Sequence, residues 1–283
     1  MRSKPKHSAE LATQATLGTP VKVLKKDGGW YYIQTPDKYL SWVDDGGITL
    51  MNNAEAQNWK KAPKIIYTET YGHAYADTNK SSIVSDLVAG NLLKVEKNEG
   101  DFYQVIFPDG RKAYVLKEHA QDYYKWRATL NATPDDLVAT SKRFMGVPYL
   151  WGGTSTKGMD CSGFTKTIYF LNGMVIPRDA SQQVHAGKFI DDKQNFEDLR
   201  KGDLLFFGTK ATDSTKERVV HVGMWIGNNE FIHESNMARI SSMDPNAPNF
   251  DEWNRNRYLR TKRILHETDK DLIDLTKTPF FTE

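Results

Sequence analysis

The strongest constraint on the fold is an internal repeat. Residues 18–43 and 90–115 align without a gap at a spacing of 72, with glycines, aromatic residues and a Pro-Asp pair at matching positions. Self-similarity at a fixed spacing indicates two copies of one structural unit. Each copy alternates short apolar runs with Gly, Asp and Pro, a pattern typical of short antiparallel strands joined by tight turns. The repeat therefore predicts two small closed β-barrels of ~60 residues each.

The order of residues within the repeat resembles that of bacterial SH3-like barrels: Gly-x-x-Val-x-Val, acidic-Gly, Trp-Tyr-x-Ile, Pro-Asp and Trp-Val. The alternative is two unrelated β segments with similar turns. A strand-like stretch at 65–75 opens the second copy, and its counterpart would fall before residue 4. We therefore expect the first barrel to lack its opening strand, and the natural N-terminus, with an export signal, to lie outside this sequence. Residues 51–61 are expected to form a helical connector.

After Trp126 the pattern changes from strands to helices. Thr133 supplies an N-cap hydroxyl, Pro134 follows at the first helical position, and two acids occupy the first turn. Helices followed by a meander of strands predict an α+β domain, with helices packed on an antiparallel sheet. The expected helices cover residues 133–145, 161–170 and 177–183, and the expected strands cover residues 203–207, 219–226, 231–234 and 258–265.

Composition excludes several classes of function. Lys plus Arg number 38 and Asp plus Glu number 36, so no basic excess indicates nucleic acid or an anionic membrane as a partner. The apolar runs are shorter than the ~20 residues that a membrane-spanning helix needs. Cys161 is the only cysteine, which excludes intrachain disulfides and thiolate zinc fingers. The sequence predicts neither a metal site nor a cofactor, because it has no zinc-like His spacing and no phosphate-binding glycine loop.

Cys161 falls in the first turn of the second expected helix, where free N–H groups and a partial positive charge lower a thiol pKa. A nucleophilic thiol also needs a base, and a third group that orients the base. His221 and His233 lie on two strands joined by a turn at Asn228-Asn229, so one ring can contact the thiol and the other can hold its tautomer. The alternatives are a small buried cysteine and ordinary core histidines.

Five motifs follow one another in this third segment: Tyr-x-Trp-Gly-Gly from 149, Asp-Cys-Ser-Gly-Phe from 160, Gly-Asp-Leu-Leu-Phe-Phe from 202, His-Val-Gly from 221 and Phe-Ile-His from 231. In this order they resemble the NlpC-type cysteine peptidases, which cut bacterial cell-wall peptides. The resemblance implies a papain-like catalytic domain. It implies that Cys161 is the nucleophile, that His221 is the general base and later the acid, and that His233 orients His221. Tyr149 would assist the oxyanion beside the backbone N–H of Cys161.

The pairing with SH3-like barrels resembles the subgroup that hydrolyses γ-D-glutamyl-diamino acid bonds, and this implies a set of substrate-binding residues. Asp179 matches an acid that binds the free amine of L-Ala, and Tyr39 matches a tyrosine that the first barrel places over the active site. Arg111 stands at the equivalent of Tyr39 in the second copy, so only the first barrel is expected to touch substrate. The alternative for Asp179 is a helix N-cap, and the alternative for Tyr39 is an ordinary position on the barrel surface. The remaining candidates for substrate contact are Glu10, Asp160, Ser162 and Arg178.

The sequence thus predicts a cysteine endopeptidase of murein peptides that prefers a free N-terminal L-Ala. The alternatives are an N-acetylmuramoyl-L-alanine amidase or acyltransferase on the same fold, and a catalytically silent wall-binding adaptor. We expect a monomer that is periplasmic or secreted, although the N-terminal residues lack an apolar signal core and by themselves also fit a cytoplasmic protein. The predicted domains are barrel 1 at 1–50, the connector at 51–62, barrel 2 at 63–122 and the catalytic domain at 123–283.

Overall fold

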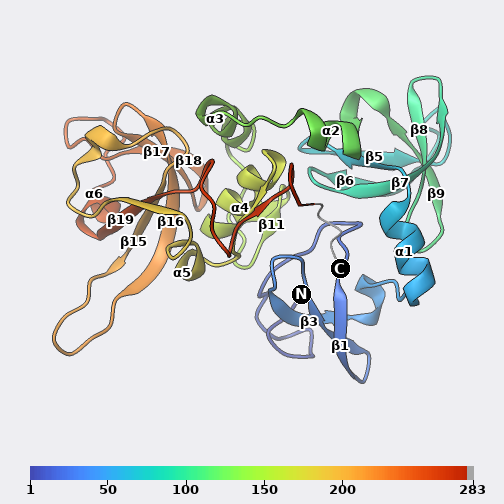
Figure 1. The fold of residues 1–283 in the computed structure, drawn as a ribbon, viewed down its shortest axis with the longest axis horizontal. Helices are drawn as coiled ribbons and strands as arrows, with labels where there is room; N and C mark the ends of the chain where they lie inside the picture. The colour runs from blue at the N-terminus through green and yellow to red at the C-terminus, as the bar shows by residue number, and fades with distance from the viewer. Residues whose placement is uncertain (279–283) are drawn as a thin grey trace. The chain divides into compact units, whose positions relative to one another are not determined.

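The computed structural model describes residues 1–278, and the chain divides into two compact units (Figure 1). Unit 1 comprises Met1–Leu130 together with Ser155–Lys157 and the residues from Leu275 onward. Unit 2 comprises Asn131–Thr154 and Gly158–Asp274. The end of the predicted catalytic domain, 279–283, lies outside the described residues.

Unit 1 is built mainly from short antiparallel strands. Its first sheet pairs three strands in the order β1-β2-β3, and its second pairs seven in the order β10-β4-β7-β8-β9-β5-β6. Helix α1 follows the first sheet, as expected for the connector, and Asn52 caps it with a reciprocal bond to Glu55. The elements are β1 (Lys22–Asp27), β2 (Trp30–Gln34), β3 (Leu40–Asp44), α1 (Asn53–Lys61), β4 (Lys64–Tyr67), β5 (Tyr71–Tyr75), β6 (Ile83–Val88), β7 (Leu92–Glu99), β8 (Phe102–Ile106), β9 (Lys112–Leu116), β10 (Ala120–Asp122) and α2 (Tyr123–Thr129).

The internal repeat is confirmed at the level of strand register. Trp30 pairs with Asp44 in the first sheet, and Phe102 pairs with Leu116 in the second, each 72 residues later. Both sheets carry a β-bulge at the same repeat position, after Val23 in one and after Val95 in the other. A β-bulge bends a strand and increases its local twist. The two meanders therefore share strand register and local twist as well as composition.

Two expectations about unit 1 are wrong. Among residues 1–278 neither sheet closes into a barrel: the first has only three strands, joined to the N-terminal residues by isolated bridges from Arg2, and the second keeps β6 and β10 as unpaired edges. Three strands are too few to close a barrel, because the smallest closed β folds use about five. The expected strand at 65–75 is two strands, β4 and β5, because the chain turns between them.

Unit 2 is an α+β domain, as predicted. Its main sheet has the order β14-β19-β15-β16-β17-β18, and helix α4 packs on one face against Val222, Met224 and Ile232. The other face buries a second cluster that includes Phe231 and Tyr258. The elements are α3 (Pro134–Lys142), β11 (Thr154–Ser155), β12 (Gly158–Met159), α4 (Cys161–Leu171), β13 (Met174–Val175), α5 (Ala180–Gln183), β14 (Lys188–Asp191), β15 (Leu204–Thr209), β16 (Arg218–Gly227), β17 (Glu230–Ser235), β18 (Met237–Ser242), α6 (Glu252–Asn256), β19 (Tyr258–Arg263) and β20 (Ile273–Asp274).

The hairpin that carries the two candidate histidines forms where the sequence predicts it. Asn228 and Asn229 both have positive φ, at 54° and 60°, which matches the tight turn that joins adjacent strands of right-handed twist. Strands β14 and β18 and helix α6 were not expected, and β18 completes the edge of the sheet next to His233. No helix within residues 1–278 is long and apolar enough to cross a membrane.

Candidate active site

Helix α4 begins at Cys161 because Asp160 caps it. The backbone of Asp160 is extended, with φ −90° and ψ 178°, and its Oδ1 accepts a hydrogen bond of 2.7 Å from the N–H of Gly163. An aspartate at this position satisfies one of the free N–H groups of the first turn. The cap therefore places the thiol of Cys161 at the positive end of the helix.

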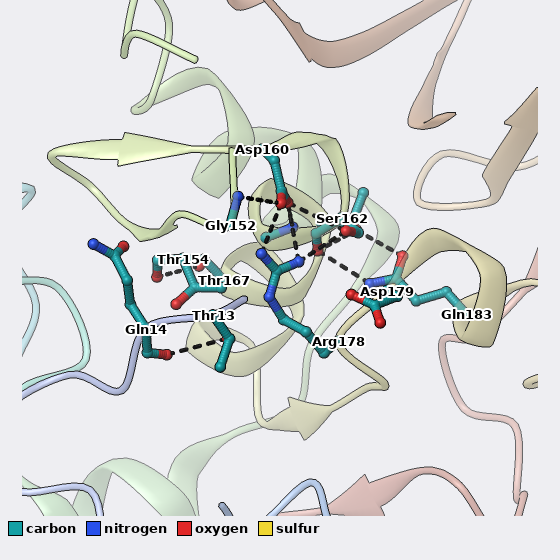
Figure 2. A network of polar contacts seen from close by, with 12 residues as sticks. Thr13, Gln14, Gly152, Thr154, Asp160, Ser162, Thr167, Arg178, Asp179 and Gln183 are labelled. Atoms are coloured by element: carbon teal, nitrogen blue, oxygen red, sulfur yellow. Dashed lines mark hydrogen bonds and ion pairs between the residues drawn. The ribbon is translucent and has the colours of Figure 1, made fainter. Parts of the chain in front are cut away.

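A buried ion pair holds Asp160 in place, as Figure 2 shows. Arg178 donates from Nη1 to Oδ1 at 3.0 Å and from Nη2 to Oδ2 at 2.7 Å, and its side chain is 1% exposed. The N–H of Gly152 donates to Oδ2 at 3.0 Å, and the hydroxyl of Ser162 donates to Oδ1 at 3.2 Å. Asp160 and Arg178, both predicted to contact substrate, thus bind each other, and this pair links the start of α4 to the loops before and after it.

Gly163 is a glycine because the backbone comes close at this point. A Cβ on Gly163 would lie 2.0 Å from the carbonyl oxygen of Gly153. Real Cβ atoms do not approach backbone oxygens so closely, so a side chain here would push the loop away from the helix. The Gly-Gly and Ser-Gly motifs of the sequence therefore serve the packing of the Tyr149 loop against α4.

Cys161, the first residue of α4, is buried, with 7% of the residue exposed. Burial raises the pKa of the Cys161 thiol to about 12, and the carboxylate of Asp160 adds to the rise. Backbone N–H groups of Val222 and Ser162 hydrogen-bond to the sulfur and oppose that rise in pKa. Since Val222 directly follows His221 in β16, the sulfur lies close to the part of the strand that carries this histidine.

His221 and His233 form a buried chain of hydrogen bonds across the hairpin. Nε2 of His221 lies 2.8 Å from Nδ1 of His233, and Nε2 of His233 lies 3.1 Å from Oγ of Ser241 on β18. If Nε2 carries the proton on both rings, each ring donates to the next group, and Nδ1 of His221 keeps its lone pair. In this tautomer His221 can act as a base.

Burial also determines the charge of these histidines. It lowers the pKa of His221 well below its usual 6.5, and the neighbouring His233 lowers it further. It lowers the pKa of His233 to about 3, with Arg239 as the next cause. The carboxylate of Asp251 lies 3.9 Å from Nε2 of His233; it raises the pKa of His221, but by less than burial lowers it. Both rings are therefore neutral at neutral pH.

Tyr149 reaches the same region from the loop before α4. Its backbone N–H donates to the carbonyl of Asn236 at 2.9 Å, which ties the loop to the end of β17. Burial raises the pKa of the Tyr149 hydroxyl above its usual 10, and the nearby Cys161 contributes to the rise. The hydroxyl is therefore a neutral hydrogen-bond donor at the candidate site.

A cavity of about 340 Å³ opens beside these groups. Tyr149 and His221 form part of its wall, and the rest comes from β17, β18 and helix α6. Its other lining residues are Glu234, Ser235, Asn236, Arg239, Asp251, Trp253, Asn254 and Arg257.

The structure places the predicted substrate-binding residues in different ways. Ser162 is buried beside the Asp160–Arg178 pair. Asp179 is the N-cap of α5, and its backbone N–H donates to Oε1 of Gln182 at 3.1 Å, as the alternative reading expected. Glu10 and Tyr39 lie in unit 1, where Glu10 is exposed and Tyr39 half-buried. For all of these, contact with substrate stays a prediction.

Three residues of the site were missed by sequence reasoning. Ser241 meets His233 because β18 pairs with β17 in a register that places Arg239 opposite His233. Asp251 precedes a five-residue helix that carries no clear sequence signal. Glu234 adjoins the Phe-Ile-His motif, and a charged residue at a buried strand position was the available signal.

Taken together, the structure combines a thiol at a helix N-terminus with a chain of buried histidines on an antiparallel sheet, the residue types that nucleophilic thiol chemistry needs. No group of His, Cys, Asp and Glu within residues 1–278 could hold a metal ion.

Comparison with known proteins assigns the family. The model of the NlpC/P60 family matches residues 146–267, and the model of the bacterial dipeptidyl-peptidase SH3 domain matches residues 1–48. The γ-D-glutamyl-L-lysine dipeptidyl-peptidase of Bacillus cereus is 34% identical over 252 residues, which cover 86% of this chain and 73% of that protein. The enzyme of the same name from Bacillus subtilis is 28% identical over 231 residues, or 79% and 72% of the two chains.

A solved structure agrees with these matches. The crystal structure of an NlpC/P60 family protein from Bacillus cereus superposes with a TM-score of 0.74 at 32% identity, and covers 91% of this chain and 82% of that one. The chain therefore belongs to the NlpC/P60 family, and the predicted resemblance to its cysteine peptidases is confirmed. An SH3 domain at the N-terminus is confirmed by the match to residues 1–48.

Proposed function

We propose that this chain is a cysteine endopeptidase that hydrolyses the γ-D-glutamyl-diamino acid bond of peptidoglycan stem peptides. Its relatives carry the names γ-D-glutamyl-L-lysine dipeptidyl-peptidase and dipeptidyl-peptidase 6. The observation that carries the proposal for this chain is the buried thiol of Cys161, bonded by the N–H of Val222, beside the chain from His221 through His233 to Ser241. A wall-binding adaptor would not need this arrangement.

The first step acylates the enzyme. Nδ1 of His221 takes the proton from the Cys161 sulfur, and the sulfur attacks the carbonyl carbon of the scissile amide. The carbonyl π electrons move to oxygen, and the hydroxyl of Tyr149 with the backbone N–H of Cys161 stabilises the oxyanion. Because both histidines start neutral, this proton transfer creates an imidazolium, and His233 stabilises it by accepting its Nε2–H.

The second half of the reaction restores the enzyme. The tetrahedral intermediate collapses, the C–N bond breaks, and His221 gives its proton to the leaving amine of the diamino acid. A water molecule then attacks the thioester carbon and transfers a proton to His221. Cleavage of the C–S bond releases the γ-D-glutamyl product and returns the neutral thiol, so the protons balance over the cycle.

The N-terminal side of the substrate is proposed to contact residues outside the cavity. Asp179, Tyr39 and Glu10 would bind the free amine of L-Ala, and Ser162 would contact the D-Glu. An ammonium group needs carboxylate or hydroxyl acceptors in a desolvated site, and these side chains supply them. The chain would accordingly prefer short stem peptides with a free N-terminus over peptides still attached to glycan.

Three finer assignments belong to the same proposal. Residues 63–122 would form a second SH3-like domain, supported by the shared register and bulge of the repeat. The protein would be a monomer. It would act in the periplasm or outside the cell, where its relatives' substrate lies.

Product analysis by mass spectrometry tests this function. Incubation with L-Ala-γ-D-Glu-diaminopimelate should release L-Ala-γ-D-Glu, and Cys161→Ala should abolish the release while leaving the fold intact. An acetylated N-terminus on the same peptide should slow cleavage by about tenfold or more, because the charged amine is lost. Release of free L-Ala instead of the dipeptide would show cleavage of the L-Ala–D-Glu bond, and no release at all, which is also the result expected of an N-acetylmuramoyl-L-alanine amidase on this peptide, would reject the proposal.

A further inference from the structure

The 340 Å³ cavity beside His221 and Tyr149 is not explained by the residues proposed for the N-terminal half of the substrate. Neither Asp179 nor Tyr39 lines it. His221 is the group that would protonate the leaving amine, so a cavity that begins at His221 lies on the leaving-group side of the scissile bond. This inference rests on the proposed function.

Glu234 is a buried carboxyl group in the wall of this cavity. The residue is 0% exposed, and neither Oε1 nor Oε2 has a hydrogen-bond partner within the described part of the chain. Burial raises the pKa of Glu234 to about 8, and the carboxylate of Asp160 adds to the rise. Leaving a buried carboxyl without a partner costs free energy, and an arriving cation would remove that cost.

Two guanidinium groups line the same cavity. Arg239 is exposed and its side chain makes no hydrogen bond or ion pair within residues 1–278. Arg257 donates from Nε and Nη2 to Oδ1 of Asn254, at 3.0 and 2.7 Å, and lies 5.3 Å from the ring centroid of Trp253. Arg257 is thus held in place, and its Nη1 can still donate to a ligand. All the guanidinium nitrogens of Arg239 can donate to a ligand.

The second acid of the cavity is already engaged. Asp251 accepts from the backbone N–H of Asn254 at 2.9 Å and from its Nδ2 at 2.6 Å. The side chains left to meet a ligand are therefore one carboxyl, Glu234, and two guanidinium groups, Arg239 and Arg257. A ligand that matches them has one ammonium group and two carboxylates.

We propose that this cavity binds the leaving diamino acid and selects one that carries an ammonium group and a carboxylate at its distal end, as meso-diaminopimelate does. Glu234 receives the distal ammonium, and Arg239 and Arg257 receive the distal and the C-terminal carboxylates. Lysine has the ammonium but lacks the distal carboxylate, so it leaves one guanidinium without a partner. Arg239 and Glu234 are thus specificity-determining residues for the side of the substrate that departs.

Two peptides that differ by this carboxylate test the role of Arg239. The wild-type chain should cleave L-Ala-γ-D-Glu-meso-diaminopimelate with a kcat/KM about tenfold or more above that of L-Ala-γ-D-Glu-L-Lys. Arg239→Gln should bring this ratio to within about threefold of one, mainly by slowing the diaminopimelate peptide. Arg218→Gln is the matched control, because Arg218 is exposed at the start of β16, away from the cavity, and should keep the wild-type ratio.

A third peptide tests Glu234. L-Ala-γ-D-Glu-L-norleucine lacks the ammonium, so the wild-type chain should cleave it about tenfold or more slowly than the lysine peptide. Glu234→Gln, which keeps the shape and removes the acid, should abolish that difference. If this variant fails to fold, the wild-type comparison of lysine with norleucine still decides the role of the ammonium.

The outcomes separate this inference from the function on which it rests. Cleavage of all three peptides at similar rates overturns the inference and leaves the endopeptidase standing. A wild-type preference for lysine over diaminopimelate, or an equal loss on both peptides in Arg239→Gln, also overturns it. If the wild-type chain cleaves none of them, the proposed function itself fails.

Discussion

The ion pair beneath the candidate nucleophile gives the sharpest test of how the site is built. Asp160→Asn keeps the size of the side chain and one oxygen that can still cap α4, but it removes the charge opposite Arg178. That guanidinium is 1% exposed, so it cannot recover its solvation in water. Breaking a buried pair by removing one partner costs about 3–5 kcal/mol. We therefore expect unit 2 to lose a large part of its stability.

The size of the thermal shift follows from the size of the unit. Unit 2 holds about 140 residues, for which each kcal/mol moves Tm by about 3–4 °C. Asp160→Asn should thus lower the Tm of this unit by roughly 10–20 °C in differential scanning calorimetry. Asp135→Asn is the matched control, because Asp135 pairs with Lys201 on the surface, with 77% of its side chain exposed. That variant should move Tm by no more than about 3 °C.

A double variant checks the reason for the loss. Asp160→Asn together with Arg178→Met removes both charges, so it should be more stable than Asp160→Asn alone by about 2 kcal/mol or more. A shift below about 3 °C for Asp160→Asn, or a double variant less stable than the single one, would refute the claim that an uncompensated buried charge dominates.

Three further predictions concern chemistry and pH. Tyr149→Phe should lower kcat by ~10²-fold or more with little change in Tm, and steady-state kinetics that match wild type would exclude its hydroxyl from the oxyanion site. His233→Ala should lower kcat far more than Ser241→Ala, because the serine bonds only to the outer nitrogen of the chain; equal effects in the same assay would contradict this order. His233 is held neutral, with its pKa lowered from 6.5 to about 3, so its contribution to stability is complete above pH 6.5 and falls as the pH drops. At pH 5 this loss is about 2 kcal/mol, and chemical denaturation that finds equal stability at pH 5 and pH 7.5 would refute it.

Local patterns in the sequence were sufficient for the main elements of the site. The turn at Asn228-Asn229 ties His221 to His233 because it joins neighbouring strands, so their approach depends only on the hairpin register. The sequence also predicts the start of the helix at Cys161, since an acid followed by small residues is typical of an N-cap. Features of this kind depend on contacts within about a dozen residues.

The remaining features depend on contacts that a pattern does not record. The pairing of Arg178 with Asp160, 18 residues away in the chain, could not be predicted from the sequence, because it exists only after α4 and the following loop pack together. Ser241 became a partner of His233 through the register of an edge strand, which has a weak alternation of polar and apolar residues. The prediction of closed barrels was wrong for a similar reason. Closure of a sheet depends on pairing between its two edge strands, and the repeat in the sequence does not record that pairing.

The deep position of the single sulfur has a consequence for durability. Peroxide and other oxidants react with the ionised form of a cysteine, and a buried neutral thiol reacts slowly. The resting enzyme, with Cys161 buried and the pKa of its thiol raised, should therefore survive in aerated surroundings where an always-ionised cysteine would be lost to sulfinic acid. The thiol would then become reactive only when a peptide is bound and the thiol proton moves to His221. The same burial that slows oxidation therefore also restricts the ionised sulfur to the enzyme with bound substrate.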